Sequence, residues 1–225
     1  MISKGILLNA EELKEAEYLL RRLGENATDV AEGKDYRWIG VADDGLRAEL
    51  VTEIITGFYK FRALEQAVRV RYEGYHHAAF LAALLSFDGE DERRSVRRAA
   101  KRFDCVSPRS LCAFCLPEFE GVWQEIAALG NRLTSRCAGL AEHYEIISFL
   151  LGISGNRAPK VRLSTPDSKT IVVGSHPYPV ADLTDDTGKN LLIAALTKRP
   201  SGIVLSDPSR FDPALIDVIE RLGES

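Results

Sequence analysis

Apolar residues between positions 46 and 68 recur at the spacing of one helix face, and this pattern constrains the fold most strongly. The residues on this face are Leu46, Leu50, Ile54, Phe58, Phe61, Leu64 and Val68. An apolar stripe of this width has to be covered by other apolar surface. The pattern therefore predicts a long helix at 46–73 that is either packed in a core or used as an interface. Gly57 lies inside it and weakens it by about 1 kcal/mol relative to alanine.

Helical patterns recur through the first two thirds of the chain. One begins after Asn9, a candidate N-cap, with Glu12 placed three residues later as in a capping box. Further helices are expected at 75–87, at 89–102, from about Pro117 onward and near 138–152. Only YRWIGVA at 36–42 alternates like a short strand in this part of the sequence.

The sequence changes character near residue 155. KVRLS (160–164), KTIVVG (169–174) and GIVLS (202–206) favour strands, and the prolines of HPYP (176–179) favour a loop. Helices are predicted at 190–197 and after Asp212, an N-cap followed by Pro213. These elements predict an α+β fold with a mainly helical region at 1–155 and a small β-β-α-β-α region at 156–225. The short linker between the regions is compatible with packing as one domain.

Composition narrows the class of protein. The chain has 225 residues and a net charge of -4, which disfavours a dedicated nucleic-acid binder. Its apolar runs are shorter than the roughly 20 residues of a membrane span, and its beginning resembles no signal sequence. We therefore expect a cytoplasmic protein with no membrane partner, in which cysteines are free thiols or metal ligands rather than disulfides.

All four cysteines fall within one third of the chain. They are Cys105, Cys112, Cys115 and Cys137. The C-x-x-C pair at 112–115 could bind one metal, and the other two could complete a four-thiolate zinc or Fe–S site. The alternatives are a redox pair and, favoured by the solitary positions of Cys105 and Cys137, free thiols buried in a helical core.

A basic run follows the acidic helix start GEDE at 89–92. Its members are Arg93, Arg94, Arg97, Arg98, Lys101 and Arg102, and they fall on one helix face. This face could bind phosphates of a nucleic acid or an acidic partner. No interleaved aromatic residues support single-strand binding, so a solvated face balanced by the acidic start is the simpler interpretation.

Other motifs carry weaker signals. His76, His77, His143 and His176 show no metal-ligand spacing and are expected in ordinary core or surface roles. TDDTGKN at 184–190 lacks most of a phosphate-binding loop, so its acidic residues are interpreted as a helix N-cap.

Three segments resemble a known family. GFYKFR (57–62) resembles the Gly-Phe-x-x-Phe-Arg segment of the sporulation protein YtxC family. EHYEIISFLLGISGNRAPKVRL (142–163) is similar to that family's E-Y-x-x-F-I-x-L-L helix leading into a strand, and DDTGKNLLIAALTKRPSGIVLSD (185–207) is similar to its acidic-start helix, proline and Ile-rich strand. The basic run and the cysteines intervene between the first two. The resemblance implies a cytoplasmic, sporulation-associated protein of endospore-forming bacteria and no catalytic residues.

These patterns favour a non-enzymatic protein that acts through a protein partner or self-association, without a cofactor. A first alternative is a protein with a Cys-ligated metal or Fe–S cluster that binds nucleic acid through the 93–102 helix. A second is a small-molecule enzyme with a site at the junction of the two regions, lined by His176 or Asp185.

Overall fold

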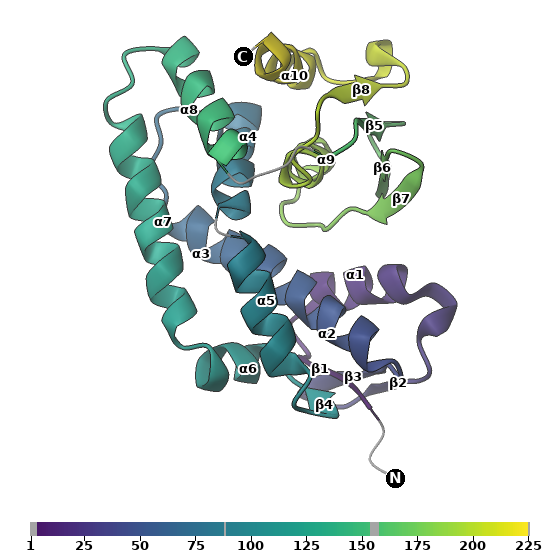
Figure 1. Ribbon diagram of the computed structural model, residues 1–225. Coiled ribbons are helices and arrows are strands. Elements are labelled where there is room, and N and C mark those ends of the chain that lie inside the picture. The colour runs from purple at the N-terminus through teal and green to yellow at the C-terminus, as the bar shows by residue number, and fades with distance from the viewer. Residues whose placement is uncertain (1–3, 88, 154–157, 225) are drawn as a thin grey trace. The chain divides into compact units, whose positions relative to one another are not determined.

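The computed structural model describes residues 4–87, 89–153 and 158–224 and confirms an α+β fold (Figure 1). The chain divides into two compact units. Unit 1 contains Met1–Arg62 and Asp88–Trp123, and unit 2 contains Ala63–Phe87 and Gln124–Ser225. Neither unit ends at the expected boundary near residue 155. The physical reason is that helices before this point in the sequence pack with helices after it, within unit 2.

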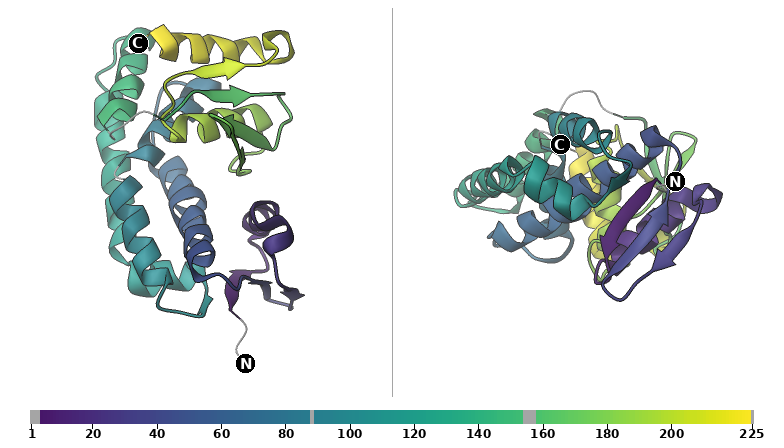
Figure 2. Two further views of the ribbon diagram at one scale, coloured as in Figure 1. Left: turned by 45° about the vertical axis from the view of Figure 1, so that its right-hand side comes forward. Right: turned by 90° about the horizontal axis from the view of Figure 1, so that it is seen from below.

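Unit 1 contains a four-stranded sheet in the order β2-β3-β1-β4. Its strands are β1 (Gly5–Asn9), β2 (Val30–Glu32), β3 (Tyr36–Gly40) and β4 (Cys105–Val106). β3 pairs antiparallel with both β1 and β2, and β4 pairs parallel with β1. The right-hand view of Figure 2 shows β1, β2 and β3 side by side. Only β3 was predicted. β2 and β4 have three and two residues and are too short to show a pattern, whereas β1 is as long as β3 and was missed.

The helices of unit 1 pack on this sheet and on one another. α1 (Leu13–Leu23) and α2 (Asp44–Glu53) follow β1 and β3, and α5 (Gly89–Ala100) lies alongside α2 (Figure 1). α6 (Pro108–Cys115) contacts β1 and α5. The 3-10 helix η1 (Gly24–Asn26) continues α1. Side chains such as Ile6, Leu8, Leu19 and Leu50 are fully buried and form the core.

The long helix predicted at 46–73 is present, but it contains a π-helical segment and ends earlier than expected. After α2 the chain forms a π-helical segment, η2 (Ile54–Tyr59), and then α3 (Lys60–Ala67). The helix ends at Ala67 rather than 73. Within unit 2, the side chain of Asn131 terminates it by donating to the Ala67 carbonyl at 3.1 Å and accepting from the Arg69 amide at 2.6 Å.

Unit 2 is organised around α4 (Gly74–Ser86), whose residues 78–86 are all buried. α4 packs against α8 (Leu140–Ile153), α9 (Thr187–Thr197) and α10 (Pro213–Glu224). A helix that is apolar on every side is stable only when it is surrounded in this way. α7 (Glu118–Thr134) begins in unit 1 and ends in unit 2.

The second sheet has the strand order β7-β6-β5-β8 and belongs to unit 2 (Figure 2). Its strands are β5 (Val161–Leu163), β6 (Thr170–Val173), β7 (His176–Pro179) and β8 (Ile203–Leu205), and the 3-10 helix η3 (Pro208–Arg210) follows β8. β5 and β8 are parallel, whereas β5–β6 and β6–β7 are antiparallel.

The expected loop at 176–179 is wrong, because HPYP forms β7. Proline is tolerated there because β7 is an edge strand. Two prolines alternate with His176 and Tyr178, so the missing amides all fall on one side of the strand. The described residues from 158 onward therefore form β-β-β-α-β-α rather than the predicted β-β-α-β-α.

Candidate interaction surface

The cysteine-containing segment folds onto the edge of the unit 1 sheet. Cys105 pairs with Gly5 in the parallel β4–β1 ladder, and α6 begins after Ser107, whose hydroxyl accepts from the Ser110 amide at 3.3 Å. Val106 and Leu111 are buried and anchor the segment. Because α6 has only eight residues, few of its side chains can face the core, and the remaining ones form surface.

The cysteines are free, but they are not the buried thiols that the sequence favoured. Cys105 is exposed, and Cys112, Cys115 and Cys137 are partly exposed. The short strand and the short helix present most of their side chains outward, which explains the error. Burial, with Glu120 and Glu118 nearby, raises the pKa of Cys112 to about 11. Burial also raises the pKa of Cys137. Both sulfurs are therefore protonated near neutral pH.

A metal site receives no support from the geometry of the described chain. The structure contains, among residues 4–87, 89–153 and 158–224, no group of three or more His, Cys, Asp or Glu side chains that could hold a metal ion. Cys105, Cys112 and Cys115 belong to unit 1, whereas Cys137 belongs to unit 2. The zinc or Fe–S interpretation remains a prediction from spacing alone.

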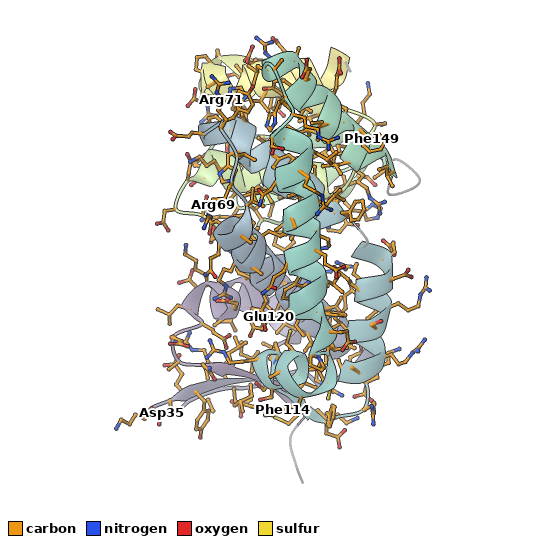
Figure 3. The ribbon with its side chains drawn as sticks, turned by 90° about the vertical axis from the view of Figure 1, so that its left-hand side faces the viewer. Asp35, Arg69, Arg71, Phe114, Glu120 and Phe149 are labelled. Carbon is orange, nitrogen blue, oxygen red and sulfur yellow. The ribbon has the colours of Figure 1, made fainter. Side chains whose placement is uncertain are left out.

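An apolar pocket lies where β4 meets α6, with a volume of about 240 Å³. We call it the Phe114 pocket, and its lining residues are Phe103, Cys105, Val106, Ser107, Ser110, Leu111, Phe114 and Cys115. The side chain of Phe114 is 83 % exposed, and that of Phe103 is 41 % exposed. Figure 3 labels Phe114 at the surface of α6. Two phenylalanines that remain in water beside a pocket indicate a surface suited to an apolar partner group.

The structure divides the basic run into two sets. Arg93 and Arg97 both bind Glu49 of α2, with Arg93 Nη2 at 2.6 Å from Oε1 and Arg97 Nε at 2.6 Å from Oε2. Arg94 forms an exposed pair with Asp91 at 3.2 Å. These three cations are engaged within unit 1. Arg93 and Arg97 reach Glu49 because α5 packs against α2, whereas Arg94 pairs within α5.

The second set is available to a partner. Arg98, Lys101 and Arg102 are exposed and form no ion pair with any residue that the structure describes. Arg98 lies in the last turn of α5, and the other two follow the end of that helix. Arg102 directly precedes Phe103, a lining residue of the Phe114 pocket, and Lys101 and Arg98 come one and four positions before Arg102.

The segment that carries the pocket is positively charged although the whole chain is acidic. The stretch 98–115 contains four cations and a single carboxylate, Asp104. Asp104 is partly neutralised by Lys4, whose Nζ lies 3.8 Å from Oδ1. Arg109 pairs with Glu11 at 3.0 Å. The local field therefore favours an anionic partner, in contrast to the net charge of -4.

The histidines occupy structural positions. His143 is fully buried in unit 2, His76 Nδ1 lies 2.7 Å from the Tyr144 hydroxyl, and His176 is exposed on β7. The acidic N-cap in TDDTGKN is confirmed, since Asp186 accepts from the Lys189 amide at 3.0 Å.

No family model matches the chain, and neither the curated proteins nor the solved structures provide a significant match. The resemblance to the YtxC family thus stays a prediction. None of the described helices combines the length and apolar character that a membrane span requires. The function has to be inferred from the surface itself.

Sequence reasoning found the cations and the cysteines of this surface but missed Phe103 and Phe114. One signal was present. In PRSLCAFC apolar residues occur on every side of a short helix, whereas a helix at the edge of a sheet can bury only one side. Leu111 is buried, whereas Phe114, one turn later and next to the end of α6, is exposed.

Proposed function

We propose that this chain is a non-enzymatic cytoplasmic protein that acts by binding a partner protein at the Phe114 pocket. The bound element would be a segment of the partner that inserts one apolar side chain into the pocket and places carboxylates against Arg98, Lys101 and Arg102. An association with sporulation is part of the proposal and is supported by the resemblance of three segments to the YtxC family.

The juxtaposition of an apolar pocket with unpaired cations carries this proposal. A volume of about 240 Å³ falls below the usual range of small-molecule sites, about 300–1,000 Å³. It suits a single side chain of the kind that anchors protein interfaces. The exposed cations complement an acidic segment and would steer its approach.

A nucleic-acid partner is less well supported. Three of the six cations in the basic run are already bound to carboxylates of unit 1, which leaves three for phosphate contacts. Phe114 offers an exposed aromatic ring, but the pocket beside it is concave and suits an inserted side chain better than a stacked base.

Two labelled peptides test the proposal. Both are amphipathic helices with the same leucine face, and the polar face carries glutamate in one and lysine in the other. We expect the acidic peptide to bind at least about tenfold more tightly, with an affinity that falls as salt is added. Fluorescence anisotropy measures the dissociation constant of each peptide.

Matched variants locate the binding. Phe114→Ser should weaken the binding of the acidic peptide by about tenfold or more. Phe149→Ser, which removes a phenylalanine 60 % exposed on α8, should leave that binding unchanged. Reversing the charge of Arg98 and Lys101 by substitution with glutamate should abolish the preference for the acidic peptide over the basic one. Reversing Arg132 and Arg136, placed equivalently at the end of α7, should leave it intact. Equal binding of the two peptides, or equal loss in both phenylalanine variants, would refute the proposal.

A further inference from the structure

A second cavity lies in unit 2 and has a volume of about 370 Å³. We call it the Arg199 cavity. It is bounded by the end of α8, the end of α9, the segment 199–203 and one side of α10. Leu151, Leu196, Ile219 and Leu222 contribute apolar surface, whereas Ser148 and Ser201 contribute hydroxyl groups. The volume lies at the lower end of the range for small-molecule sites.

The cavity has one charged residue among the described lining residues, and that residue is Arg199. None of the described lining residues is a histidine, a cysteine or a carboxylate. This cavity lies at the junction where the sequence had suggested an enzyme site, yet neither His176 nor Asp185 lines it. Its chemistry is therefore suited to binding rather than to catalysis.

The backbone of Arg199 provides an independent observation. Its φ is 50°, and it is the only non-glycine residue with a positive φ in the described part of the chain. The residue terminates α9: its amide donates to the Leu196 carbonyl at 2.8 Å, and its carbonyl accepts from the Ala158 amide at 2.9 Å. Glycine is the usual residue at such a helix end, because a side chain is disfavoured in the left-handed region.

An arginine at this position is thus unfavourable for the backbone, and the residue is part of the cavity lining. Glycine would make the same two backbone hydrogen bonds without strain. Strained positions in folded proteins concentrate where ligands bind. Arginine is also the side chain best suited to hold a carboxylate or phosphate through two parallel hydrogen bonds.

We infer that the Arg199 cavity binds a small amphipathic anion, with its carboxylate or phosphate group on Arg199 and its apolar body against Leu151, Leu196 and Ile219. This ligand site lies in unit 2 and is independent of partner binding at the Phe114 pocket. The two proposals can therefore be tested separately, and refuting one does not refute the other.

Four small probes test the inference by amide NMR shifts at Ser148, Gly152, Ser201 and Gly202. Benzoate and phenyl phosphate carry both parts of the expected ligand, benzyl alcohol lacks the charge, and inorganic phosphate lacks the ring. We expect saturable shifts with benzoate or phenyl phosphate, at least tenfold weaker binding of benzyl alcohol, and no saturable binding of inorganic phosphate at the same concentrations. Whichever of the two amphipathic anions binds more tightly identifies the preferred head group.

Arg199→Gly separates binding from folding, because it removes the charge while relieving the backbone. This variant should unfold at a temperature no lower than the native chain and should lose the preference for the anions. Arg199→Lys should retain part of it, and Lys198→Gln, which removes the neighbouring cation, should retain all of it. Absence of saturable shifts with both anions, equal binding of benzyl alcohol, or native-like binding by Arg199→Gly would overturn the inference.

Discussion

Replacing Lys60 with methionine is expected to destabilise unit 1 by about 3–5 kcal/mol, the largest single-residue effect that we predict. Lys60 is fully buried, and its Nζ lies 2.7 Å from Oε2 of Glu92, which is itself only 5 % exposed. Trp123 Nε1 donates to the other oxygen of Glu92 at 3.1 Å. Removing the cation leaves a buried carboxylate without its charge partner, and solvation cannot compensate for this loss.

A double variant distinguishes this cause from simple loss of packing. Lys60→Met combined with Glu92→Leu removes both charges, so it should be markedly more stable than either single variant. Arg94→Met, which breaks the exposed pair with Asp91 on the same helix, should change stability by about 0.5 kcal/mol or less. Additive losses in the double variant would show that the charges are not coupled.

Tryptophan fluorescence during urea unfolding measures these differences. Both tryptophans of the chain, Trp38 and Trp123, lie in unit 1. The signal therefore reports on the unit that contains the ion pair.

Acid should destabilise unit 2 through His143. Its side chain is fully buried, and neither ring nitrogen makes a well-formed hydrogen bond with a described residue, although the backbone of His76 is close enough to favour the protonated ring. The rings of Tyr72 and Phe80 lie 4.5 Å and 5.3 Å from it, centroid to centroid. Burial in this aromatic environment lowers the pKa of His143 to about 4. Positive charge on His76 and His77 also lowers the pKa of His143.

The sign of the effect follows from proton uptake. An unfolded chain binds a proton at His143 near pH 6.5, whereas the folded chain binds it only near pH 4. The stabilisation is thus complete above pH 6.5 and is lost progressively as the pH falls toward 4. This difference in pKa corresponds to about 3 kcal/mol of folding stability.

His143→Phe isolates this contribution from that of other titrating groups, including Asp217 and Arg221 of α10 near Tyr144. The variant should match the native chain within about 1 kcal/mol at pH 7.5, since it replaces an unpaired polar ring by an apolar one. It should exceed the native stability by about 2–3 kcal/mol at pH 4.5. Circular dichroism at 222 nm would follow unfolding. A stability difference that does not vary with pH, or an equal effect of His176→Phe on the exposed β7, would contradict this account.

Local features of the fold could be predicted from sequence, because their causes are local. Asp186 and Asp212 each accept a backbone hydrogen bond at the start of a helix, as the sequence indicated for these segments. The Glu12 carboxylate also accepts from the Asn9 amide at 2.8 Å, as a capping box requires. The helix itself begins later, at Leu13.

Features that depend on distant residues could not be predicted. β4 has two residues and exists only because β1, a hundred positions earlier, lies beside it. The basic run shows the same limit at the site. Its helical spacing was visible in the sequence, yet Glu49 decides which arginines are engaged and belongs to another helix. The Phe114 pocket likewise depends on how α6 packs at the sheet edge, which no local pattern specifies.

Site-specific photo-crosslinking tests the proposed partner surface most directly. A benzoylphenylalanine is placed at position 114, or at position 149 as the matched exposed control, and the full chain is irradiated in its native cell. From position 114 we expect a defined protein, joined through an acidic segment with an apolar anchor. Reversal of Arg98 and Lys101 should reduce this product, whereas reversal of Arg132 and Arg136 should not. Identical products from the two positions, a product insensitive to charge reversal, or crosslinks only to lipid or to a second copy of the chain would contradict it.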